Sequence, residues 1–199
     1  HGTAQLAAGQ DLDTTLNVST PGAGSLTQFN RFCSGDLAPE PAFYNPATGL
    51  GTREPIFLDG EEAAGGRVIA HVLSDRTATQ LTAWDGLNGA WENALARPLA
   101  SDTTVVIATS DGGDNRVFIA VGSKRSEGTT LEKAGLTGGS VSGIQVVLDG
   151  ANVAAESRAL GFAASGDPVL SARFTLAPGR AGTSFSRPED GAWDPENPA

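Results

Sequence analysis

Short runs of β-branched residues, each bounded by a glycine-rich turn, are the feature that most restricts what this chain can fold into. The clearest pair is residues 104–109 (TVVIAT) and 116–121 (RVFIAV), which flank the sequence DGGDN at 111–115. β-branched side chains favour strands, whereas Gly, Asn and Asp tolerate the positive φ angles of tight turns. The pattern predicts a hairpin whose turn begins at Asp111. The turn also resembles a calcium loop, but it lacks the closing Glu of an EF-hand.

Similar runs along the chain predict further strands. A second hairpin is predicted from residues 55–58 and 67–73, which flank a Gly- and Glu-rich loop at 59–66. The remaining predicted strands are 80–84, 143–148 and 172–176. His71 lies within an apolar run, and we expect it to be packed in the interior.

The composition agrees with an all-β fold that contains little helix. The chain has 26 Gly among 199 residues, about twice the ~7% of average usage. Short helical turns are predicted only at 91–96, which Pro98 would end, and at 131–134. Hairpins separated by long loops are typical of propellers and of sandwiches, and the composition does not choose between these two architectures.

Charge and residue counts exclude several classes of function. The net charge is −10 and the 13 basic residues are scattered, which argues against a nucleic-acid-binding protein. No run approaches the ~18 apolar residues that a membrane-spanning helix needs. One Cys excludes an internal disulfide framework, and two His leave little for a zinc site. A metal site in this chain would therefore depend on Asp and Glu.

Three segments place carboxylates at or beside predicted strand ends. They are RFCSGD at 31–36 with the later FLDGEE at 57–62, AWEN at 90–93, and RPED at 187–190. Carboxylates that converge would repel one another, and bound cations would relieve the repulsion. The segments are therefore candidates for one shared cation site.

Taken in order, these motifs resemble the PhoX family of alkaline phosphatases. That family is marked by a Cys-x-Gly segment, a Gly-Thr, a Glu-Glu pair and a later Arg-Pro-Glu. The matching residues here are Cys33, Gly51-Thr52, Glu61-Glu62, Glu92 and Arg187-Pro188-Glu189. The similarity extends from about Arg31 to Pro195, which is most of the chain.

The resemblance implies a β-propeller whose central channel holds iron and calcium ions. It implies that Cys33, Glu92 and Glu189 are iron ligands. It also implies that Glu61 or Glu62 binds calcium and that Arg187 contacts the substrate phosphate. The expected activity is metal-dependent hydrolysis of phosphate monoesters by a periplasmic or secreted enzyme.

The expected fold class is all-β, with antiparallel propeller-like blades. At ~40–50 residues per blade, residues 1–199 are too few for a typical closed ring with long loops. We therefore expect them to form part of one propeller domain that continues at both ends. The outer strands would then pair with further parts of the same chain or with another protein chain.

Departures from the family pattern leave a second interpretation open. Residues 37–45 intervene where the family's Cys segment leads directly to Thr-Pro-Trp-Gly-Thr. Gly60 and Trp91 stand where the family has Cys and His. The alternative is a non-catalytic propeller of a cell surface that binds calcium.

The individual motif residues also have structural alternatives. Cys33 would then be a small buried hydrophobe, the Glu61-Glu62 pair a solvated turn, Glu92 the start of a helix, and Arg187 half of an ion pair.

Overall fold

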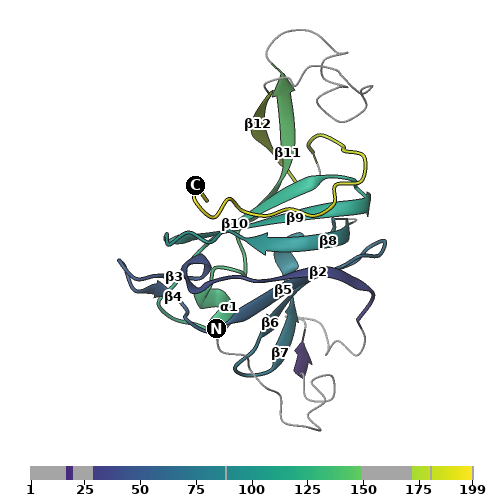
Figure 1. Cartoon of the computed structure of the whole chain (residues 1–199). Helices are drawn as coiled ribbons and strands as arrows, with labels where there is room; N and C mark the ends of the chain where they lie inside the picture. The colour runs from purple at the N-terminus through teal and green to yellow at the C-terminus, as the bar shows by residue number, and fades with distance from the viewer. Residues whose placement is uncertain (1–16, 20–28, 88, 149–171, 180, 199) are drawn as a thin grey trace.

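The computed structural model describes residues 17–19, 29–87, 89–148, 172–179 and 181–198. They form mostly antiparallel β-sheet, with 45% strand and 7% helix, which confirms the predicted all-β class. Two five-stranded sheets make up the body, and a two-stranded sheet lies at its side (Figure 1). No helix in these ranges is long and apolar enough to cross a membrane.

The first sheet has the strand order β1-β7-β6-β5-β2. Its members are β2 (Phe32–Leu37), β5 (Ile56–Glu61), β6 (Val68–Val72), β7 (Thr77–Gln80) and β1 (Asn17–Ser19). Strand β1 runs parallel to β7, and the other pairs are antiparallel. Between β2 and β5 the chain forms the 3-10 turn η1 (Glu40–Ala42) and the small hairpin of β3 (Tyr44–Asn45) and β4 (Leu50–Gly51).

The second sheet follows chain order, because its strands lie in the order β8, β9, β10, β11, β12. Its members are β8 (Gly89–Ala96), β9 (Thr103–Gly113), β10 (Val117–Ser123), β11 (Ser140–Leu148) and β12 (Ala172–Pro178). The turn η2 (Thr82–Trp84) precedes this sheet in the chain. Helix α1 (Thr130–Lys133) precedes β11 and confirms the turn predicted at 131–134.

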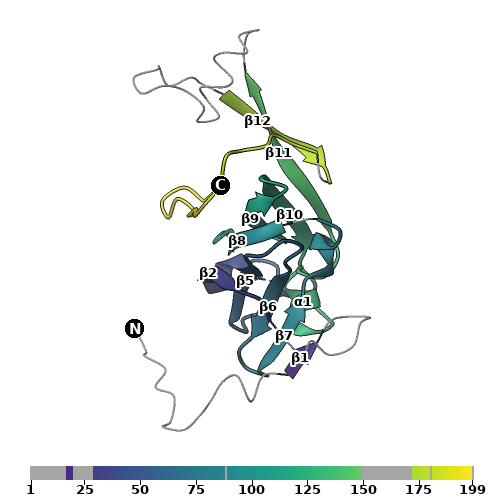
Figure 2. The ribbon, with the colours of Figure 1, turned by 90° about the vertical axis from the view of Figure 1, so that its right-hand side faces the viewer.

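The two sheets pack against each other, with β8 lying on β2 and β5 (Figures 1 and 2). Alternation along β5 turns Ile56 and Leu58 into the shared core, where both are fully buried. Trp91 of β8 is 0% exposed, and its ring meets those of Trp84 and Phe118 edge-on. The Trp91 indole also donates to the Gly66 carbonyl at 2.9 Å, which links β8 to the loop between β5 and β6.

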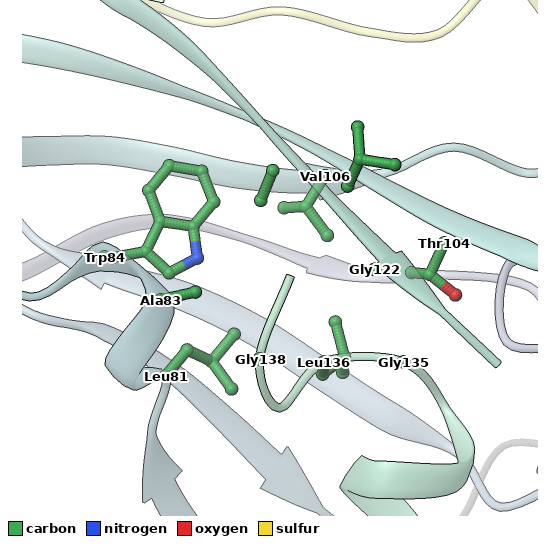
Figure 3. Close-up of a pocket in the computed structure, with 11 residues that line it drawn as sticks. Leu81, Ala83, Trp84, Thr104, Val106, Gly122, Gly135, Leu136 and Gly138 are labelled. Carbon is green, nitrogen blue, oxygen red and sulfur yellow. The ribbon is translucent and has the colours of Figure 1, made fainter. Parts of the chain in front are cut away.

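A small apolar pocket lies at the seam between the sheets (Figure 3). Trp84, Val106 and Leu136 contribute to its lining. The pocket is part of the packed interior and contains no member of the carboxylate motifs.

The segment 181–198, named here the C-terminal strap, has no regular secondary structure and crosses the second sheet (Figure 1, yellow). Hydrogen bonds to several strands anchor it. The Thr183 amide donates to the Ile144 carbonyl at 2.9 Å, and the Phe185 amide donates to the Asn115 carbonyl at 2.8 Å. The Trp193 indole donates to the Leu95 carbonyl at 3.2 Å. The strap thereby brings residues 187–190 to strands β8 and β9.

Some sequence predictions need correction. Residues 91–96 form strand β8 and are not helical. The predicted turn at Asp111 is displaced, because β9 continues to Gly113 and the chain turns at Asn115, whose φ is 50°. Of the predicted strand 80–84, only Gln80 belongs to a strand, and η2 begins at Thr82. The prediction that His71 is packed is confirmed, since it is buried in β6.

The two five-stranded sheets are open, and no closed barrel or propeller is found among the described residues. Strands β2, β5, β6 and β7 form an antiparallel meander within the first sheet. Strands β8 to β12 form another antiparallel meander in the second sheet. The first strands of the two meanders, β2 and β8, lie next to each other. The carboxylate motifs are found at this junction.

Candidate functional site

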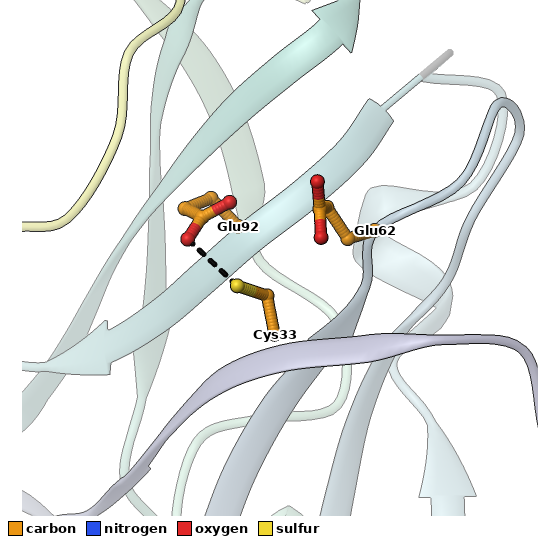
Figure 4. Close-up of side chains that lie close together, drawn as sticks. All are labelled: Cys33, Glu62 and Glu92. Carbon is orange, nitrogen blue, oxygen red and sulfur yellow. Dashed lines mark hydrogen bonds between the residues drawn. The ribbon is translucent and has the colours of Figure 1, made fainter.

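Three side chains from separate strands meet where β2, β5 and β8 approach one another (Figure 4). They are Cys33 of β2, Glu92 of β8, and Glu62, which directly follows β5. One potential ligand atom from each lies within 4.8 Å of the other two. All three belong to the motifs identified in the sequence, although they are up to 59 positions apart.

A second group shares one member with the first. Glu92, Asp111 of β9 and Glu189 of the C-terminal strap also offer ligand atoms within 4.8 Å of one another. Glu92 is only 4% exposed and therefore lies at the inner end of both groups. We name the set of Cys33, Glu62, Glu92, Asp111 and Glu189 the acidic cluster.

Irregular strand pairing directs two of these side chains into the acidic cluster. Between β8 and β9, Trp91 pairs with Ser110 while Asn93 pairs with Thr109, so Glu92 is an extra residue in β8. The β2–β5 register also shifts by one residue between Phe32 and Gly35, which is where Cys33 lies. A bulge leaves a residue unpaired and changes the direction of its side chain, and bulges are common beside functional sites.

A hydrogen bond links Cys33 to Glu92. The thiol donates to Glu92 Oε1 at a distance of 2.9 Å (Figure 4). This bond raises the pKa of Cys33 to about 12, with smaller contributions from burial and from the negative charges of Glu92 and Glu62. The thiol is consequently protonated at neutral pH unless a cation replaces its proton.

Arg187 neutralises part of the second group. Its guanidinium donates to both carboxylate oxygens of Asp111, at 3.1 and 2.9 Å, and lies 2.8 Å from Glu189 Oε1. The hydrogen bonds from Arg187 hold the pKa of Asp111 below its ordinary value, and Asp111 in turn raises the pKa of Arg187. The Arg187 side chain remains 71% exposed, so its outer face is open to solvent.

Arg31 has a comparable role beside the first group. Its guanidinium contacts Glu62 Oε1 at 2.9 Å and donates to the Glu62 carbonyl at 2.9 Å. The Glu62 amide donates to the Arg31 carbonyl at 2.7 Å. These contacts fix Glu62 at the edge of the acidic cluster.

Ser34 connects the strands of the site to the C-terminal strap. Its hydroxyl lies 2.9 Å from the Glu92 carbonyl and 3.1 Å from Asp190 Oδ1. The neighbouring Asp36 accepts a hydrogen bond from the Ala96 amide at 2.9 Å, which ties β2 to β8 once more. Burial raises the pKa of Asp36, although the bond from Ala96 opposes this effect.

Glu61, the alternative to Glu62 as a calcium ligand, is not in the acidic cluster. It is buried on the other side of β5 and forms an ion pair with Arg67, whose Nε donates to Glu61 Oε2 at 2.6 Å. Burial opposes ionisation of Glu61, but hydrogen bonds from Arg67 and from the Asn30 amide outweigh burial and lower its pKa. Both carboxylate oxygens of Glu61 therefore have partners apart from the acidic cluster.

The donor set of the acidic cluster is suited to cations. Carboxylate oxygens are the preferred ligands of calcium, and a thiolate beside carboxylates suits a transition metal such as iron. Four carboxylates and one thiol face only the two guanidinium groups of Arg31 and Arg187 among the described residues of the site. The Thr109 hydroxyl, two residues before Asp111 in β9, is buried without a hydrogen-bond partner among the described residues. The residues present therefore fit the metal ions that the family resemblance implies.

Sequence reasoning does not identify Asp111 or Arg31 as parts of the site. The sequence DGGDN predicts a turn that begins at Asp111, yet this residue is still on strand β9. Arg31 belongs to the Cys33 motif, but the family resemblance gives it no role. Its position two residues before Cys33 is a usable signal, because such residues share a face of an extended strand.

Comparison with family models, with curated proteins and with solved structures gives no match to this chain. The functional interpretation therefore rests on the geometry of the acidic cluster and on the motif order in the sequence.

Proposed function

We propose that the acidic cluster binds metal ions and that the chain belongs to a metal-dependent phosphomonoesterase of PhoX type. One observation carries the proposal. Cys33, Glu62, Glu92 and Glu189, which match the family's motifs in order, converge in two groups that share Glu92. A chance similarity of short motifs gives no reason for residues so far apart in sequence to converge.

The sheet arrangement supports a further part of this proposal, that the two sheets are neighbouring propeller blades. Strands β2-β5-β6-β7 of the first sheet and β8 to β12 of the second are antiparallel meanders, and propeller blades are small sheets of this kind arranged around a central channel. In such an arrangement β2 and β8, the first strands of the meanders, would be the innermost strands. The acidic cluster would then face the channel.

The two groups differ in donor chemistry, and this difference supports two kinds of cation. The group of Cys33, Glu62 and Glu92 includes sulfur and suits iron. The group of Glu92, Asp111 and Glu189 offers oxygen alone and suits calcium. Bound cations would polarise the phosphoryl oxygens and neutralise charge that develops during hydrolysis.

The chain's own residues would hold and orient the substrate. The planar guanidinium of Arg187 suits phosphate oxygens, and its exposed outer face leaves donors for them. Glu92 accepts the hydrogen bond of the Cys33 thiol, so it positions the sulfur that must lose its proton when a cation binds. Ser34 holds β2, β8 and the C-terminal strap together around this point.

The test is hydrolysis of p-nitrophenyl phosphate by protein supplied with iron and calcium. Cys33→Ala should lose bound iron and reduce kcat/KM at least about 100-fold while keeping the far-ultraviolet circular dichroism of the fold. Glu40→Gln, an exposed carboxylate outside the acidic cluster, is the matched control and should retain activity. If the unaltered protein hydrolyses nothing, or if Cys33→Ala keeps its activity, the phosphatase proposal is wrong and a calcium-binding structural role becomes the better account.

A further inference from the structure

Two arginine side chains flank the acidic cluster, and each is attached to a different part of it. Arg31 contacts Glu62 of the first group at 2.9 Å, and Arg187 contacts Asp111 of the second group at 2.9 Å. The two groups meet at Glu92. The guanidinium groups therefore lie toward opposite ends of the acidic cluster.

Both arginines are far more exposed than the carboxylates they contact. The Arg31 side chain is 68% exposed and Glu62 is 17% exposed, while the corresponding values for Arg187 and Asp111 are 71% and 7%. Each guanidinium carries five N–H donors. Arg187 shares its donors between Asp111 and Glu189, and Arg31 uses one nitrogen for the carboxylate and the carbonyl of Glu62. Donors on both arginines thus remain available to a ligand at the rim.

Each arginine also acts electrostatically across the acidic cluster. The pKa of Asp111 is lowered mainly by its hydrogen bonds with Arg187, and the charge of Arg31 adds to this effect. The pKa of Arg187 is raised mainly by Asp111, and Glu62, the partner of Arg31, contributes. The two ion pairs are therefore electrostatically coupled, and the ligand groups that they border share Glu92.

We propose that Arg31 is a second anion-binding residue at the rim of the acidic cluster, and that the preferred substrate carries a second negative group near its phosphate. This inference rests on the proposed function, because Arg187 is the residue that takes the phosphate. Cations bound by the carboxylates would compensate their charge and weaken their hold on both guanidinium groups. The second negative group of the substrate then pairs with Arg31, while its phosphate pairs with Arg187.

The experiment uses unreactive anions, so that it does not depend on hydrolysis. Binding of methylphosphonate, phosphonoacetate and 3-phosphonopropionate to the cation-loaded chain is measured by isothermal titration calorimetry. Methylphosphonate carries one anionic group, and the other two carry a carboxylate at increasing distance. At least one of these two should bind roughly three- to tenfold more tightly than methylphosphonate, the effect of one partly exposed charge pair.

Variants separate this role of Arg31 from a merely structural one. Arg31→Gln should lower the affinity for the two-charge anion to that for methylphosphonate, so that the preference is abolished. Arg31→Lys should retain part of the preference. Arg53→Gln removes an arginine of similar exposure that pairs with Glu40 instead, and it should change nothing.

The outcomes also distinguish this inference from the proposed function. If Arg31→Gln keeps the preference, or if the unaltered chain binds all three anions equally, Arg31 does not bind substrate, whereas phosphomonoesterase activity can still be present. Should Arg31→Gln weaken all three anions equally and lose cations, its role is only to position Glu62. If the unaltered chain neither binds these anions nor hydrolyses p-nitrophenyl phosphate, both proposals are wrong.

Discussion

Glu61 and Glu62 are adjacent in sequence, but their side chains have different partners in the structure. Glu61 ends β5 and pairs with Arg67 on its outer side, whereas Glu62 reaches the acidic cluster. The sequence can predict that one of the pair is a site residue, because successive residues of an extended chain point in opposite directions. It cannot predict which one, since that depends on the register between β2 and β5.

The thiol of Cys33 gives the first prediction at the residue scale. Its pKa is raised to about 12, chiefly by the hydrogen bond to Glu92, so little reactive thiolate exists at pH 8. In cation-free protein, Glu92→Gln should lower this pKa toward the ordinary value and speed alkylation by iodoacetamide at pH 8 at least about tenfold. The measurement is the alkylation rate between pH 7 and 10. An unchanged pH profile would show that Glu92 does not control the thiol.

The ion pair of Glu61 and Arg67 gives the second prediction at the residue scale. Arg67→Ala leaves a buried carboxylate without its main partner, and it should reduce the free energy of unfolding by about 1–3 kcal/mol at pH 7. Because the folded-state pKa of Glu61 is lowered, the stabilisation is present above its ordinary value of 4.5 and is lost as pH falls through the folded-state value. The difference in unfolding free energy between the unaltered protein and Arg67→Ala should therefore become smaller at acidic pH. Urea unfolding at pH 7 and pH 3 measures it, and a constant difference would contradict this assignment.

At the scale of elements, strands with a regular sequence pattern are predicted more accurately than strands with an irregular one. Strands β9 and β10 are predictable because each contains a continuous run rich in β-branched residues. Strand β8 resembles a helical turn in sequence because Glu92 is an extra residue in it, so Trp91 and Ala94 both face the core despite their odd spacing. Strand β2 gives no strand signal, since its sequence FCSGDL lacks β-branched residues.

The contact between β5 and β8 gives the third prediction, because it sets the spacing of the acidic cluster. A Cβ atom at Gly60 would lie 2.4 Å from Trp91 Cβ and 2.9 Å from the Trp91 carbonyl oxygen. Gly60→Ala should therefore push the strands apart and cost about 1–3 kcal/mol of unfolding free energy. The control is Gly191→Ala, whose Cβ would make only an ordinary contact of 3.5 Å with Leu95. Equal urea midpoints for these two variants would show that the close approach is not limiting.

At the scale of the whole molecule, the acidic cluster needs both sheets and the C-terminal strap. The first sheet supplies Cys33, the second supplies Glu92 and Asp111, and the strap supplies Glu189. The sequence of the strap gives no indication that this segment lies across β8, because the strap has no periodic pattern of apolar residues. The motif resemblance is the signal that relates Glu189 to Glu92, the residue common to both ligand groups.

The docking of the strap gives the fourth prediction. The Trp193 indole holds the strap to β8 through the Leu95 carbonyl, and the side chain lies outside the acidic cluster. Trp193→Ala should weaken cation binding roughly three- to tenfold by loosening Glu189, while the sheets stay folded. Titration calorimetry with calcium measures the affinity, and Glu196→Gln at the exposed end of the strap is the control. Unchanged affinity would show that Glu189 is held without Trp193.

The most direct test of the acidic cluster as a cation site is the metal content of the purified chain after incubation with iron and calcium, measured by inductively coupled plasma mass spectrometry. Glu92 belongs to both ligand groups, so Glu92→Gln should lower the content of both metals, whereas Glu40→Gln should leave it unchanged. We predict at least one tightly held metal ion in the unaltered chain and a marked loss in Glu92→Gln alone. Equal metal content in all three proteins, or none in the unaltered chain, would contradict the assignment.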